Sequence, residues 1–104
     1  MGALRRHDDD ALLTRRVDEV LHYLWDPVGV ARCPQARDEY DAYVPGVVAL
    51  LRQDTATSVL AEHLVRIERS RMGLASNPER AAVVADVLVG FKRVLDERSP
   101  WLDA

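Results

Sequence analysis

The sequence holds one cysteine, Cys33, among 104 residues, so no disulfide can form within the chain. No apolar run approaches the roughly 20 residues that a membrane-spanning helix needs. The formal net charge is only -3, which gives no basis for sequence-independent binding to phosphate backbones. These absences predict a domain that folds around its own apolar core, with neither nucleic acid nor a membrane as a partner.

Sequence motifs for catalysis and cofactor binding are also missing. The glycines stand singly and form no phosphate-binding loop or dinucleotide fingerprint, and there is no GxSxG or HExxH motif. We therefore expect no cofactor, no metal site and no catalytic residue. The first ten residues contain no apolar run, so we also expect no secretory signal and a cytoplasmic location.

What the sequence does have is helical apolar spacing, and no segment alternates as a strand would. We expect helices over about 10–24, from 34 to about 51, over about 55–72, and from 76 or 77 to about 98. The third should be capped by Asp54 or Thr55. The expected inner stripes are Leu13, Val17, Val20, Leu21 and Leu24 in the first helix, and Leu60, Leu64 and Ile67 in the third. Three aspartates at 8–10 should cap the first helix, Gly73 should stop the third in the left-handed conformation, and Ser76 and Glu79 have the spacing of a capping box for the fourth. Trp101 and Leu102 are expected to fold back behind Pro100 as an apolar tail.

Pro45 and Gly46 interrupt the apolar stripe of the second helix, and an interior proline removes a backbone hydrogen bond and bends the helix. Short connections favour antiparallel neighbours. The sequence therefore predicts an all-α, compact four-helix up-down bundle with a kinked second helix. One domain should span 1–104, with residues 1–8 flexible and 99–104 as a tail.

The most distinctive segment lies between the first two helices and reads Trp25-Asp26-Pro27-Val28-Gly29-Val30. Asp26 before Pro27 can accept backbone N–H bonds and fix a turn, and Gly29 permits a positive φ. Trp25 is large enough to cover one end of the core, with the two valines as apolar anchors. The segment is either a structural plug between helices or a recognition loop.

A second motif, Asp38-Glu39-Tyr40-Asp41-Ala42-Tyr43, follows on the second helix. Asp38 and Asp41 should share one helix face, and Tyr40 and Tyr43 another, with rings inside and hydroxyls at the rim. Arg37 stands four residues before Asp41 and can pair with it. The alternative is that the carboxylates hold a metal or perform acid–base chemistry.

These two motifs, together with Arg66-Ile67-Glu68 and Met72-Gly73-Leu74, resemble a group of small bacterial proteins of unknown function and, more distantly, a small helical family typified by an uncharacterised bacillus protein. The resemblance covers about Leu21 to Leu74, and its specific part is the WDPxG element. It implies a small helical bundle from a bacterium and brings no catalytic residues.

The fourth helix carries apolar residues on more than one face. Its main stripe consists of Val84, Val87, Leu88, Phe91, Val94 and Leu95. Val83, Asp86, Val89 and Gly90 form a second face, and a helix that is apolar all round is buried. The helix is therefore either central to the bundle or paired with a second copy in a two-fold homodimer, which we favour. In both arrangements Asp86 would need a buried cationic partner.

Three functional classes compete. The one best supported is a non-catalytic protein-interaction module with an unidentified protein partner, such as a bacterial immunity or adaptor protein. The second is a metal-binding or hydrolytic helical bundle that uses the helix-two carboxylates with His63 or Glu62. The third is a nucleic-acid binder that uses Arg66, Arg69 and Arg71, whose charge Glu62 and Glu68 partly neutralise.

Overall fold

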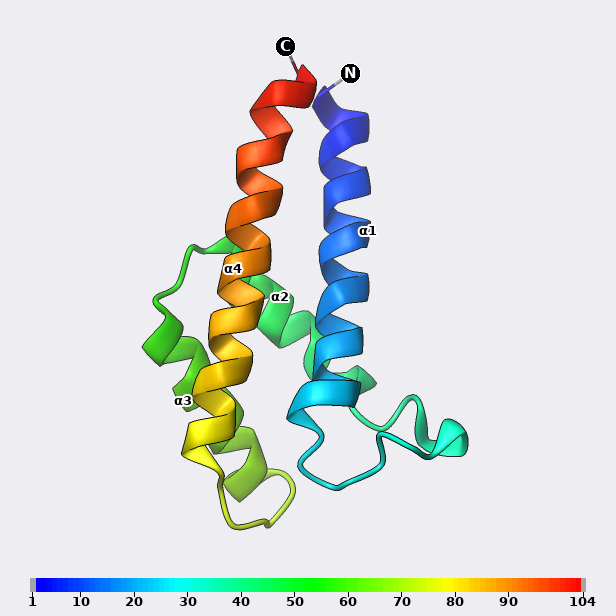
Figure 1. Ribbon diagram of the computed structural model, residues 1–104, viewed down its shortest axis with the longest axis vertical. Coiled ribbons are helices and arrows are strands. Elements are labelled where there is room, and N and C mark those ends of the chain that lie inside the picture. Colours follow the sequence, from blue (N-terminus) through cyan, green and yellow to red (C-terminus); the bar gives the residue numbers. More distant parts are fainter. Residues whose placement is uncertain (1, 104) are drawn as a thin grey trace.

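The computed structural model describes the backbone of residues 2–103 and the side chains of residues 9–97. It confirms an all-α, four-helix bundle with no strand in that range and with a second helix bent by 33°. The longest helices, α1 (Gly2–Val20) and α4 (Pro78–Asp103), lie side by side and run antiparallel, as Figure 1 shows. None of the described helices is both long and apolar enough to cross a membrane.

The first helix starts earlier than predicted and ends in an unusual turn. α1 begins at Gly2, so the aspartates at 8–10 lie within it and do not cap it. It passes into one π-helical turn, η1 (Leu21–Trp25), which ends before Pro27 as expected. The wider π turn rotates each residue less about the axis than an α turn does. The buried face therefore continues through Leu21 to Trp25, whereas Leu24, which we expected inside, is exposed.

The second helical segment is divided. The stretch expected to be its first half consists of a 3-10 turn, η2 (Pro34–Ala36), further turns, and a second 3-10 turn, η3 (Asp41–Tyr43). The α-helix proper, α2 (Val44–Arg52), begins only at Val44 and carries Pro45 in its first turn. A proline is accepted there because first-turn N–H groups have no intrahelical acceptor.

The last two helices pack against each other. α3 (Thr57–Ser70) ends two residues earlier than predicted, but Gly73 is left-handed as expected, at φ +65°, and the Leu74 N–H donates to the Glu68 carbonyl at 2.9 Å. The expected cap at residues 54–55 is wrong, because α3 starts after Ala56 without a side-chain cap. α4 is capped by Asn77, whose Oδ1 accepts the Arg80 N–H at 3.1 Å. Its helical backbone continues past Arg98 to Asp103, and the side chains of Trp101 and Leu102 lie outside the described residues.

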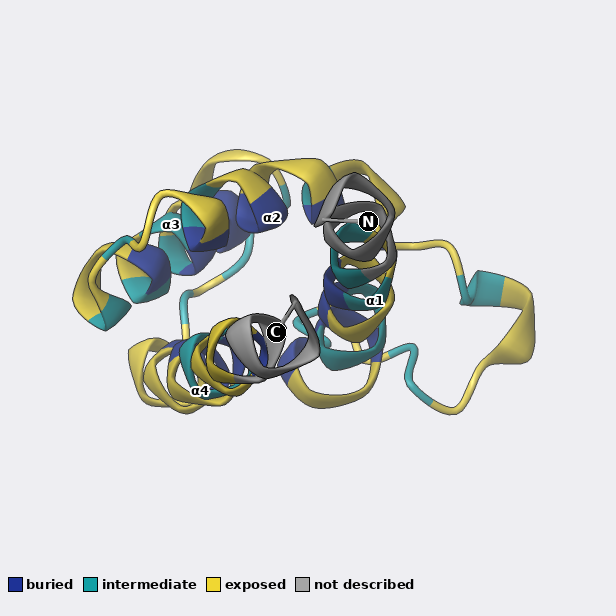
Figure 2. Ribbon diagram, turned by 90° about the horizontal axis from the view of Figure 1, so that it is seen from above, coloured by how far each residue is buried: buried dark blue, intermediate teal, exposed yellow. Residues whose placement is uncertain are grey.

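The core lies between the four helices, whose buried faces turn toward one another in Figure 2. It includes the predicted inward residues Leu13, Val17, Leu60, Leu64 and Ile67. From α4 it takes Ala81, Val84, Ala85, Leu88 and Leu95. The loop after η1, with η2, projects from one side of the bundle.

Candidate functional site

Trp25 is the anchor of the loop between η1 and η2. Its side chain is fully buried, which confirms the prediction that it covers part of the core. The Tyr40 ring packs on it at a centroid distance of 5.4 Å, and the Tyr43 ring meets it edge-on at 6.2 Å. Val30 also packs against the core, whereas Val28, expected as a second anchor, is exposed.

Asp26 organises the backbone of this loop. It adopts the left-handed conformation at φ 35°, and Gly29 follows at φ 82°. Its carboxylate accepts the Val30 N–H at 2.7 Å and the Ala31 N–H at 3.0 Å. The turn predicted from Asp26-Pro27 is therefore present, and both oxygens of the carboxylate hold it.

The Tyr40 hydroxyl joins the loop to the second motif. It donates to Asp26 Oδ1 at 2.7 Å and accepts the Val28 N–H at 3.0 Å. The prediction that this hydroxyl lies at the rim is wrong, because it is bonded inside the loop while the ring packs against Trp25. The two motifs thus form one unit, in which the Asp26 carboxylate and the Tyr40 hydroxyl bond to each other and to the loop backbone.

The titration behaviour of this unit follows from those bonds. Burial alone would raise the pKa of the Asp26 carboxyl, but the hydrogen bonds from Tyr40, Val30 and Ala31 outweigh it, and the pKa lies below the ordinary 3.8. Burial and the bond to Asp26 both raise the pKa of Tyr40. Asp26 is therefore an ionised acceptor and Tyr40 a protonated donor, which suits a structural tie better than acid–base exchange.

The acidic residues of the second motif are not brought together as a site. Asp38, Glu39 and Asp41 are exposed on turns and not on one helix face. Arg37 was expected to pair with Asp41, but it forms two hydrogen bonds with the Asp18 carboxylate, at 3.1 and 3.0 Å. The guanidinium meets both oxygens of Asp18 with its fork of donors, and this pairing joins residues 19 apart in the sequence.

The structure also separates the residues of the metal hypothesis. His63 lies on α3 beside Gly46 of α2, with its Nε2 3.6 Å from where a β-carbon of Gly46 would stand. Burial and the nearby Arg66 charge lower the pKa of His63. Within the described part of the chain, no three carboxylate, histidine or cysteine side chains gather as metal ligands would.

Two buried polar side chains were not predicted. Glu68 is 2% exposed, and burial raises its pKa, although the Asn77 N–H, donating at 3.4 Å, and the Arg80 charge oppose this. The indole N–H of Trp25 is near enough to lower that pKa further, yet it is not in hydrogen-bonding geometry. His22 is also buried, and its Nδ1 has no partner among the described residues. Glu68 continues the helical spacing of Leu60 and Leu64 on α3, and this spacing could have predicted that Glu68 is buried.

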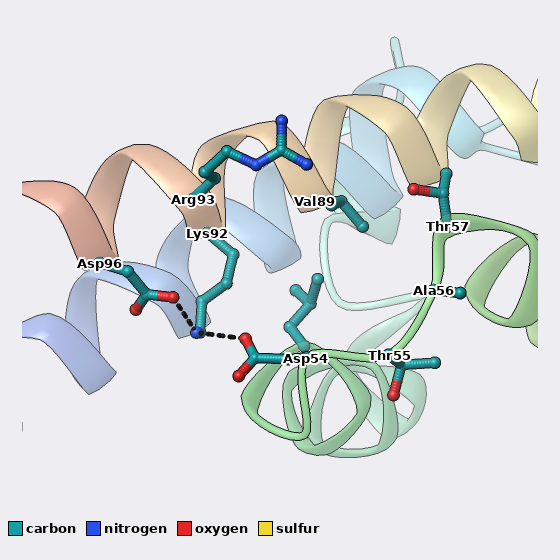
Figure 3. Close-up of a pocket in the computed structure, with 9 residues that line it drawn as sticks. Asp54, Thr55, Ala56, Thr57, Val89, Lys92, Arg93 and Asp96 are labelled. Atoms are coloured by element: carbon teal, nitrogen blue, oxygen red, sulfur yellow. Dashed lines mark hydrogen bonds and ion pairs between the residues drawn. The ribbon is translucent and has the colours of Figure 1, made fainter.

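A cleft of about 340 Å³ lies between α4 and the loop that joins α2 to α3, as Figure 3 shows. Lys92 of α4 forms ion pairs with Asp54 of that loop at 3.4 Å and with Asp96 of its own helix at 2.5 Å. Arg93 turns away from these ion pairs. The lysine is thus neutralised by two carboxylates of its own chain, whereas the side chain of Arg93, which also lines the cleft, has no ion-pair or hydrogen-bond partner among residues 9–97.

The outer side of α4 remains uncovered. Val83, Val87 and Val94 are 62%, 42% and 59% exposed, and we call them the valine face. Their spacing of four and seven residues places them on one stripe. Nothing in the described chain lies within 4 Å of where a β-carbon of Gly90, also on this stripe, would stand.

This outcome corrects the predicted faces of α4. Val87 and Val94 were assigned to the core and are exposed, whereas Val89 was assigned to the second face and packs partly against the core. Asp86 is exposed and not buried. The side chain of neither Asp86 nor Arg93 has an ion-pair or hydrogen-bond partner among residues 9–97.

No protein-family model, curated protein sequence or solved structure matches this chain.

Proposed function

We propose that the protein is a non-catalytic protein-interaction module that associates through the valine face of α4. The observation that carries this proposal is the set of three exposed valines on one helical stripe, whereas the Asp26 carboxylate of the distinctive loop motif is already bonded within the chain. Contiguous exposed apolar surface on a small domain marks an interaction site. The occupant that we propose is a second copy of the chain.

Charge and shape favour that occupant. In an antiparallel pair of α4 helices related by a two-fold axis near residue 89, Val83 of one copy lies opposite Val94 of the other. Val87 then faces Gly90, where the absent side chain allows close approach. Such an interface is isologous, so each contact occurs twice.

Asp86 and Arg93 flank the stripe on the same side of α4. They are seven residues apart, about 10 Å along the axis, too far to pair within one chain. In the antiparallel pair the same flanks meet, which places Asp86 of each copy opposite Arg93 of the other. Two intermolecular ion pairs then form, and they use two side-chain charges of each copy that have no partner among residues 9–97.

Matched glutamate substitutions test the proposal. Val83→Glu and Val87→Glu place a charge in the valine face and should abolish dimerisation in sedimentation velocity. Val59→Glu on α3 is the control, because Val59 is 45% exposed but lies outside the valine face. It should leave the dimer intact. Equal loss of association in all three variants, or no dimer in the unmodified protein, would overturn the proposal.

Two biological roles fall within this class of interaction module. An immunity protein and an adaptor would both use such a module, and the sequence resemblance to small bacterial proteins is compatible with either. A toxin gene beside the gene for this chain would support the immunity role, and a metabolic operon would not.

A further inference from the structure

The cleft between α2 and α3 differs in charge from the cleft at Lys92, which two carboxylates line. It has a volume of about 380 Å³ and lies where the first turn of α2 meets the outer side of α3. Its cationic lining consists of Arg66 and Arg71, with His63 beside them, and no carboxylate lines it. In a chain with a net charge of -3, this is a local excess of positive charge.

The two arginines are available to a ligand. Four other cations are already engaged in ion pairs: Arg16 with Glu19, Arg37 with Asp18, Arg52 with Asp10, and Lys92 with Asp54 and Asp96. The side chain of neither Arg66 nor Arg71 forms an ion pair or hydrogen bond with any residue in 9–97. Arginine presents a planar fork of donors that fits carboxylate and phosphate oxygens.

The floor of the cleft is apolar and the remaining donors lie around it. Ile67 is buried and the Tyr43 ring is half-buried, while Gly46 leaves the space in front of His63 open. The Ser70 hydroxyl also lines the cleft. The first turn of α2 adds the positive end of a helix dipole. A cationic rim above an aromatic and aliphatic floor fits a molecule with an anionic head and an apolar body.

We infer that the α2–α3 cleft binds a small organic anion, a carboxylate or phosphate carried on an apolar body, with Arg66 and Arg71 holding the charged group. The volume is in the range of pockets for one compact molecule, which favours a small ligand over a macromolecular surface. This site is separate from the valine face on α4, so its failure would leave the proposed dimer untouched.

The site is tested by titrating the full chain with model anions while heteronuclear NMR spectra record the chemical shifts. Phenyl phosphate should bind saturably, with shifts centred on Gly46, His63 and Arg71, and more tightly than inorganic phosphate, which lacks the apolar body. Benzoate tests whether a carboxylate head suffices, and benzyl alcohol, which has no charge, should not bind. Arg66→Gln with Arg71→Gln should weaken binding of phenyl phosphate by about tenfold or more.

Arg15→Gln is the matched control, because Arg15 is an exposed arginine on α1 outside the cleft. It should bind phenyl phosphate as the unmodified protein does, and an unchanged melting temperature of the double variant would confirm that it folds. Should the double variant fail to fold, Ser70→Leu, which fills the cleft from an exposed position, replaces it and should also weaken binding. No saturable binding of phenyl phosphate up to about 10 mM, or equal losses in Arg15→Gln, would overturn the inference.

Discussion

Single residues decide how the loop between the first two helices is held. Trp25 supplies apolar volume, and Asp26 supplies acceptors for two backbone N–H groups and one hydroxyl. Tyr40 serves both purposes, because its ring packs on Trp25 while its oxygen bonds to Asp26 and Val28. Each of these residues therefore has a separable contribution to stability.

Replacing Trp25 with alanine should lower the free energy of unfolding by about 3 kcal/mol or more, because a fully buried indole leaves a cavity. Urea unfolding at neutral pH measures this. Tyr23→Ala is the control, since Tyr23 is exposed on the same π turn and should cost much less. A Trp25→Ala variant with an unchanged melting temperature would show that the indole is not part of the core.

The Asp26–Tyr40 bond should make stability depend on pH. Because the folded-state pKa of Asp26 lies below its ordinary 3.8, the ionised carboxylate stabilises the fold above that value. This contribution is lost as the pH falls through the folded-state pKa. Between about pH 5 and pH 2, the unmodified protein should therefore lose more unfolding free energy than Asp26→Asn does.

Tyr40→Phe should cost about 1–2 kcal/mol at neutral pH and reduce the same pH dependence, because it removes the hydroxyl that favours the ionised carboxylate. Asp38→Asn, at an exposed carboxylate of the same segment, is the control and should leave the pH profile unchanged. A constant difference between Asp26→Asn and the unmodified protein at all pH values would contradict this account.

At the scale of elements, the two ends of the loop from α3 to α4 are fixed by different devices. Gly73 adopts φ +65° after α3, and Asn77 caps α4. A left-handed conformation costs an L-residue with a β-carbon about 1–2 kcal/mol. Gly90, by contrast, lies inside α4 with open space around it, where glycine only weakens the helix.

Gly73→Ala should therefore destabilise the protein by about 1 kcal/mol, whereas Gly90→Ala should stabilise the folded monomer by about 0.5–1 kcal/mol. Thermal unfolding at low micromolar concentration measures both without a contribution from dimerisation. The two variants carry the same substitution and should shift the melting temperature in opposite directions. Shifts of the same sign would contradict the conformations described for these glycines.

Helix spacing predicted the elements well and their boundaries less well. The steps of Leu60, Leu64 and Ile67 identified the inner face of α3, and Pro27 marked the end of the first helix. The π turn could not be predicted, because nothing in LHYLW distinguishes a wider turn from an α turn. That turn moved Leu24 out of the core and Trp25 into it.

The candidate residues were identified better than their roles. Asp26 and Tyr40 were both singled out, but their hydrogen bond joins residues 14 apart through a tertiary contact that periodicity does not encode. The pairing of Arg37 with Asp18, and not with Asp41, which is nearer in the sequence, also depends on a tertiary contact. The cationic cleft was missed because Arg66 and Arg71 meet Tyr43 and Gly46 only after α2 and α3 pack together.

At the scale of the whole molecule, α4 is the helix that the other elements leave partly bare. It buries Val84 and Leu88 against the core but leaves the valine face open on its outer side. The alternative in which α4 is central and covered by its neighbours is contradicted at Val83, which is 62% exposed. A second copy of the chain is the partner that we propose for this surface, and it would pair Asp86 with Arg93.

The most direct test of this account is the mass of the unmodified protein in solution, measured by sedimentation equilibrium over a range of concentrations. We expect a reversible monomer–dimer equilibrium in which the mass reaches twice the chain mass of 11.7 kDa at tens of micromolar. We also expect weaker association at high salt, because two intermolecular ion pairs are screened. A mass of 11.7 kDa at every concentration up to about 100 µM would contradict this account.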